Sequence, residues 1–133
     1  MRIAVTMGCA LACYLLAFLF TFRFYYVAPD RVIKAARAQI KTFMAALDLY
    51  KTDTGHFPTT EQGLQALRTA PPGVGSWKGP YLAGEIPNDP WRHSYVYHYP
   101  SNHGDEPEII SYGADGQPGG DGINADIVNW KAQ

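Results

Sequence analysis

The feature that most constrains this chain is a run of twenty uncharged, mostly apolar residues at positions 3–22. A helix of that length spans roughly 30 Å, the thickness of a bilayer core. A cleaved signal peptide is the alternative, but its apolar core is about 7–15 residues long and precedes a small-residue cleavage site. Here Arg23 and three aromatic residues follow, as at a membrane interface. The sequence therefore predicts a single-pass anchor and interfacial segment over residues 1–29, and a separate domain over residues 30–133.

Charge divides the chain in the same way. Residues 1–51 carry a net charge of +5 and residues 52–133 a net charge of −6, which leaves −1 overall. The chain has no overall excess of basic residues, so its charge gives no reason to predict a nucleic-acid partner. The basic residues lie mainly on the C-terminal flank of the apolar run, so a positive-inside count alone would place the second domain in the cytoplasm.

A second helix is predicted directly after Pro29. Apolar residues recur there at intervals of three and four, which is the spacing of one helix face. We expect that face to pack on the domain or in a filament; its main residues are Ile33, Ile40, Phe43 and Leu47. Asp30 suits the start of the helix and Thr54-Gly55 its end, while Pro29 predicts a kink toward the apolar run.

Short elements are predicted beyond residue 53, because glycine and proline recur every few residues up to Pro90. Thr59 to Gln62 resembles a capping box, which predicts a short helix through Leu67. Alternating or β-branched patterns then predict strands over residues 94–99, 108–112 and 127–130. One helix followed by short antiparallel strands gives an α+β fold.

The segment before the last strand has the composition of a hard-cation site. Residues 113–126 contain five glycines, three aspartates, one asparagine and one glutamine. Calcium binds six to eight oxygen ligands from carboxylates, amides and carbonyls, and glycines let a backbone wrap the ion. The spacing is not that of an EF-hand, and an ordinary acidic turn is the alternative interpretation.

Catalytic patterns are weak in this sequence. The four histidines lack metal-ligand spacing, and no serine or cysteine nucleophile motif is present. Cys9 and Cys13 lie in the apolar run, one helical turn apart, where small packing residues are expected. We therefore predict that the protein is not an enzyme and has no small-molecule substrate.

Several spaced motifs resemble one family. The run from Ala46 to Leu67, ALDLYKTDTGHFPTTEQGLQAL, is similar to the major pseudopilins of type II secretion systems, as are GPYL (79–82), PNDPW (87–91), SYGADG (111–116) and NADI (124–127). The resemblance covers residues 30–130. It implies a type IV pilin-like fold: a long kinked N-terminal helix, its first half transmembrane, packed on a small antiparallel sheet with a Gly/Asp-rich C-terminal loop.

The resemblance also implies a function and a location. The chain would be a structural subunit of a pseudopilus, anchored in the inner membrane with its C-terminal domain in the periplasm. Its partners would be other pseudopilins, the inner-membrane secretion platform and membrane lipid. It further implies one bound Ca²⁺ in the loop, with expected ligands Asp115, Asp121, Asp126, Asn124 and carbonyls near Tyr112 and Gln117.

The N-terminus departs from the family pattern. Members carry a basic leader ending in glycine and a glutamate five residues into the mature chain; here Gly8 and Cys9 stand at the expected processing site, but Cys13 replaces the glutamate. A carboxylate buried in lipid is costly, so it is expected to pair with a partner such as the N-terminal amine of a neighbouring subunit. Two hypotheses therefore stay open: a pseudopilus subunit, or an uncleaved, anchored periplasmic binding or regulatory module that does not polymerise.

Overall fold

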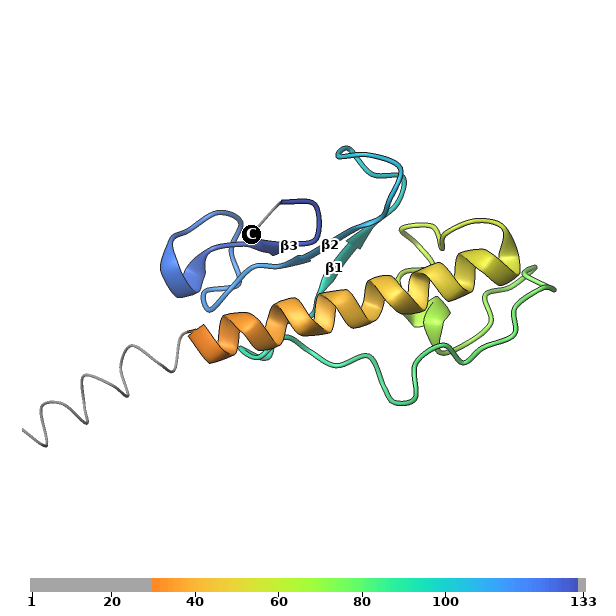
Figure 1. Ribbon diagram of the computed structural model, residues 1–133, viewed down its shortest axis with the longest axis horizontal. Helices are drawn as coiled ribbons and strands as arrows, with labels where there is room; N and C mark the ends of the chain where they lie inside the picture. Colours follow the sequence, from red (N-terminus) through yellow and green to blue (C-terminus); the bar gives the residue numbers. More distant parts are fainter. Residues whose placement is uncertain (1–29, 132–133) are drawn as a thin grey trace, which may run out of the picture. The chain divides into compact units, whose positions relative to one another are not determined.

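The computed structural model describes residues 30–131 (Figure 1). A long helix covers residues 30–54 and is followed by irregular chain with a short 3₁₀ helix, η1 (Leu64–Leu67). Three short strands then form the sheet: β1 (Val96–His98), β2 (Glu108–Ser111) and β3 (Ile127–Val128), with a second 3₁₀ helix, η2 (Gly122–Asn124), before the last. The arrangement is α+β, as predicted.

The long helix buries the face that its periodicity predicts. Ile40, Phe43 and Leu47 are at most 3% exposed, whereas Ile33 is only partly buried against the core. The helix ends at Thr54, where Gly55 has φ +85° and its N–H donates to the Lys51 carbonyl over 2.7 Å. This left-handed glycine terminates the helix as expected.

The sheet is antiparallel in the order β1-β2-β3, with Tyr97 opposite Ile109 and Ser111 opposite Ile127. The strands are shorter than predicted because other partners take the flanking backbone groups. At the end of β1, the Tyr99 N–H donates to the Thr60 hydroxyl over 2.9 Å, and the Tyr99 carbonyl accepts from the Thr60 N–H over 3.1 Å.

Asn129 shortens the third strand in a similar way. Its side-chain oxygen accepts from the Ile109 N–H over 2.8 Å, and its amide nitrogen donates to the Pro107 carbonyl over 2.8 Å. The side chain thus takes up backbone groups that a longer strand would pair. The predicted strand over residues 127–130 is therefore reduced to Ile127–Val128.

The core joins the helix to the sheet. The Phe43 ring meets Tyr95 edge to face, with centroids 5.1 Å apart, and Ile109 and Leu67 are fully buried beside them. Tyr97 is also buried, and its hydroxyl donates to the Pro58 carbonyl over 2.7 Å. This bond attaches the segment that follows the long helix to β1.

The predicted helix after Thr59 is only partly correct. The capping contacts form, since the Thr59 N–H donates to Gln62 Oε1 over 3.0 Å and the Gln62 N–H donates to Thr59 Oγ1 over 3.3 Å. They close a turn, however, and Gly63 at φ +59° interrupts the backbone before the helix begins. Only the four residues of η1 are helical, with 3₁₀ geometry.

Several sequence predictions concern residues before position 30. The membrane span over residues 3–22, the kink at Pro29, and the processing residues Gly8 and Cys9 lie outside the described residues. Between residues 30 and 131, no helix is both long and apolar enough to cross a membrane.

Candidate functional site

The predicted cation-binding loop is a closed, hydrogen-bonded unit between β2 and β3. The Ala114 N–H donates to the Ile123 carbonyl over 2.9 Å, and the Asp126 N–H donates to the Gly119 carbonyl over 3.2 Å. Residues 112–126 therefore leave one strand of the sheet and return to its neighbour, so both ends of the loop rest on the core.

The three aspartates take different positions in this loop. Both carboxylate oxygens of Asp126 lie 3.0 Å from the Gly119 N–H, and Asp115 Oδ1 accepts from the Gln117 N–H over 3.1 Å. Asp121 is exposed and directly precedes η2. Two of the three carboxylates thus shape the loop that carries them.

Two glycines allow the loop to fold back on itself. Gly113 has φ +63° and Gly120 φ +79°, and a Cβ on either would lie within 2.8 Å of the Asn124 backbone. A side chain at either position would push the backbone of Gly113 or Gly120 away from the backbone of Asn124. Asn124 is consequently enclosed by backbone from both halves of the loop.

The donor chemistry fits a hard cation. Carboxylate, amide and backbone carbonyl oxygens lie along residues 112–126, which is the ligand class that Ca²⁺ prefers. Across residues 30–131, no three His, Cys, Asp or Glu side chains gather closely enough to hold a metal ion. A calcium shell here could take no more than two of the three expected aspartates, so the remaining oxygens would have to come from the backbone and from Asn124.

A buried carboxylate, Asp89, lies next to the start of the loop and was not predicted from the sequence. The Asp89 side chain is fully buried; its Oδ2 accepts from the Ser111 hydroxyl over 2.6 Å, and its Oδ1 accepts from the N–H of His93 over 2.8 Å. His93 Nδ1 lies 3.1 Å from the Gly113 carbonyl. The PNDPW motif contains Asp89, but no local pattern in the sequence pairs it with residues twenty positions away.

A second buried carboxylate lies at the other end of β2. Glu108 accepts from the Asn102 N–H over 2.7 Å and from the Ser101 hydroxyl over 3.0 Å, and its Oε1 is 2.6 Å from Nδ1 of His103. Burial by itself raises the pKa of Glu108, but these hydrogen bonds outweigh it and hold the pKa below 4.5. The His103 ring stacks on Trp130, so this cluster joins the β1–β2 connection to the chain that follows β3.

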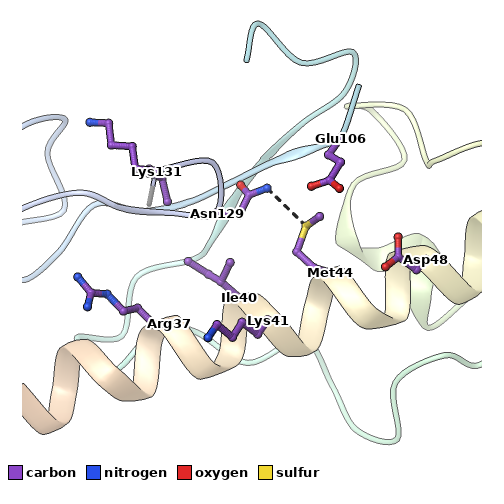
Figure 2. Close-up of a pocket in the computed structure, with 9 residues that line it drawn as sticks. Arg37, Ile40, Lys41, Met44, Asp48, Glu106, Asn129 and Lys131 are labelled. Carbon is purple, nitrogen blue, oxygen red and sulfur yellow. Dashed lines mark hydrogen bonds between the residues drawn. The ribbon is translucent and has the colours of Figure 1, made fainter. Parts of the chain in front are cut away.

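A groove of about 380 Å³ lies between the long helix and the C-terminal segment. Figure 2 shows the residues that line it. Met44 and Asn129 face each other across it, with the Asn129 amide 3.6 Å from the Met44 sulfur. Ile40 and Val128 also line the groove. Its charged side chains lie with the cations and the carboxylates toward opposite ends: Arg37, Lys41 and Lys131, and then Asp48 and Glu106.

The packing residues predicted on the helix are used within the domain. Ile40, Phe43 and Leu47 belong to the core cluster, and Ile33 packs against its edge. The exposed side of the same helix carries Leu49, which is 58% exposed.

The long helix packs on a small antiparallel sheet, with a Gly/Asp-rich loop between β2 and β3, and this arrangement is type IV pilin-like. The structure matches the crystal structure of the major pseudopilin from the type 2 secretion system of enterohaemorrhagic Escherichia coli. The match has a TM-score of 0.68 at 29% identity and covers 81% of this chain and 94% of that one. The predicted fold class is thereby confirmed.

Sequence comparison identifies the family. The protein-family model "Type II secretion system (T2SS), protein G" matches residues 28–130 of the sequence, and the chain belongs to this family. It is 43% identical over 90 residues to type II secretion system core protein G of Vibrio cholerae, and 40% identical over 106 residues to that of Pseudomonas aeruginosa. The alignments cover 66% and 77% of this chain, and 61% and 74% of those relatives.

Proposed function

We propose that this chain is a structural subunit of a type II secretion pseudopilus. The observation that carries the proposal is the family match over residues 28–130, together with a fold that covers 94% of a major pseudopilin chain. In this role the protein makes and breaks no covalent bonds of a substrate. Its long helix presents a rigid surface, and its partners are other pseudopilin subunits and the inner-membrane secretion platform.

The proposed location is the inner membrane, with residues 30–133 in the periplasm. The uncharged run over residues 3–22 supports a single membrane span, and the family supports the orientation against the charge count of the flanking residues. Protease added to intact inner-membrane vesicles of known sidedness tests this. Digestion from the cytoplasmic face would contradict the proposed topology.

The groove of Figure 2 is the proposed contact surface for a neighbouring subunit. Its two charged ends give a direction along the helix, and Met44 adds apolar area between them. Opposed charges fix register and orientation at an interface more than they add affinity. Lys41→Glu should therefore reduce assembly, whereas Lys34→Glu, an exposed change on the same helix outside the groove, should not.

We also propose that residues 112–126 bind one Ca²⁺. Two of the three aspartates Asp115, Asp121 and Asp126 would be direct ligands, and the Asn124 amide and carbonyls near Tyr112 and Gln117 would supply the other oxygens. When bound, calcium would neutralise the carboxylates that bind it and link the two halves of the loop. The chain's own contribution is the closed backbone, since Gly113 and Gly120 keep the loop folded around Asn124.

Thermal melts of the full chain in detergent micelles test the calcium site. Calcium at 100 times its dissociation constant should add about 2.7 kcal/mol to the free energy of unfolding, and EDTA should remove it. Asp115→Ala should abolish this increment, whereas Asp105→Asn, an exposed change in the β1–β2 connection, should retain it. A wild-type melt that is the same in calcium and EDTA would contradict the site.

Intact mass measured on protein extracted from its native membrane tests the role as a subunit. A mass that shows cleavage after Gly8 supports entry into a filament. An uncleaved mass, with the protein absent from any filament fraction, would contradict the proposal and favour an anchored periplasmic module that does not polymerise.

A further inference from the structure

His93 is the side chain that joins the body of the domain to the first turn of the loop. Its Nδ1 lies 3.1 Å from the Gly113 carbonyl oxygen. A Cβ on Gly116 would lie 3.0 Å from Cε1 of the same ring, so the imidazole also packs against the chain at Gly116. One ring therefore contacts the loop on both sides of Asp115.

The backbone turn that carries the imidazole is itself held by Asp89. Asp89, whose side chain is fully buried, accepts from the backbone N–H of Trp91 over 3.0 Å and from that of His93 over 2.8 Å. The Asp89 N–H returns a bond of 2.8 Å to the His93 carbonyl, and Ser111 ties the carboxylate to β2. The turn over residues 89–93 is thus fastened to the strand that leads into the loop.

The hydrogen bond to Gly113 defines the role of the ring. A carbonyl oxygen only accepts, so Nδ1 must carry the proton and donate. The neighbouring titratable groups on packed elements are Asp89, whose Oδ2 is 4.0 Å from Nδ1, and Asp115 in the loop. Because a neutral imidazole with its proton on Nδ1 already makes this bond, the contact does not depend on protonation of the ring.

We propose that His93 is a positioning residue for calcium: it holds the turn over residues 113–116 in the metal-binding conformation and so raises calcium affinity. This rests on the proposed calcium site in residues 112–126. A loop that must be ordered on binding loses affinity, whereas one already held in place does not. Partners that orient ligands from behind typically change metal affinity by about 10–100-fold when they are mutated.

The side-chain chemistry offers a matched set of variants. In asparagine the Nδ2 donor is attached to Cγ, as Nδ1 is in histidine, so His93→Asn keeps a donor near the Gly113 carbonyl. His93→Gln moves the donor one bond further, and His93→Ala removes it. Arg92→Ala is the control, because it changes an exposed side chain on the same turn.

Calcium titration calorimetry on the full chain in detergent micelles, with urea unfolding in EDTA, tests the proposal. We expect His93→Ala to raise the calcium dissociation constant about 10-fold or more, with His93→Asn and Arg92→Ala remaining within about 3-fold of wild type, or roughly 0.7 kcal/mol. His93→Gln should bind calcium more weakly than His93→Asn.

Two results would overturn the proposal. One is calcium binding by His93→Ala that is as tight as in wild type. The other is a His93→Asn variant that folds as stably as wild type in EDTA and yet binds calcium as weakly as His93→Ala. If His93→Ala fails to fold without calcium, the comparison of His93→Asn with His93→Gln decides. A wild-type chain that binds no calcium would refute the site itself, which is a different result from normal binding by His93→Ala.

Discussion

Replacing Phe43 by alanine tests the packing of the long helix on the sheet. Phe43 is 0% exposed, and its ring meets Tyr95 edge to face at 5.1 Å. A fully buried Phe→Ala change costs about 3–5 kcal/mol, through lost burial and the cavity left behind. The aromatic pair accounts for about 0.5–1.5 kcal/mol beyond burial, so the upper half of that range is expected.

The measurement is urea unfolding of the full chain in detergent micelles, followed by near-ultraviolet circular dichroism. Leu49→Ala is the matched control, because Leu49 lies on the same helix but is 58% exposed. Its midpoint should change little, since surface substitutions usually fall within about 0.5 kcal/mol. A loss below about 1 kcal/mol for Phe43→Ala would refute the packing, because that is far less than burial of a whole ring predicts.

Three further predictions concern single contacts. The pKa of Glu108 is lowered in the folded state, so its contribution to stability is complete above its ordinary pKa of 4.5 and is lost as pH falls through the folded value. Wild type should therefore lose more stability than Glu108→Gln between pH 7 and pH 3 in urea titrations, and parallel losses would contradict this. Arg92 has φ +76°, a conformation costing about 1–2 kcal/mol for a residue with a Cβ; Arg92→Gly should raise the urea midpoint while Arg92→Ala does not. Asn129→Ala leaves the Ile109 N–H and the Pro107 carbonyl without their partner, so it should cost about 1–3 kcal/mol by the same assay, and an unchanged midpoint would show that water replaces the amide.

Local patterns in the sequence were sufficient for the helix and its buried face. The three-four spacing from Ile33 to Leu47 requires no knowledge of the rest of the fold, and the left-handed Gly55 follows from helix termination alone. The strand positions were also predicted, because alternation over Tyr95 and Tyr97 is a local signal. Their lengths were not, since Thr60 and Asn129 take over flanking backbone groups from distant positions.

The candidate site was also predicted only in part: its loop was predicted from local composition, and the side chains that support the loop were not. The composition of residues 113–126 indicated a loop of oxygen ligands, and Gly113 and Gly120 indeed allow close backbone approach there. Asp89 was missed as a buried carboxylate because the tertiary fold brings its partner Ser111 to it, and Glu108 because the turn between β1 and β2 folds His103 back onto it. Nothing in the local sequence distinguishes His93 from the exposed His98.

Assembly of this chain into a pseudopilus is tested most directly by immunogold electron microscopy of material sheared from native cells, with an antibody against residues 30–131. We expect filaments labelled along their length, at a yield that falls when EDTA removes calcium or when the subunit carries Lys41→Glu. Label confined to membrane vesicles, with no labelled filament in calcium, would contradict the assignment of this chain as a pseudopilus subunit.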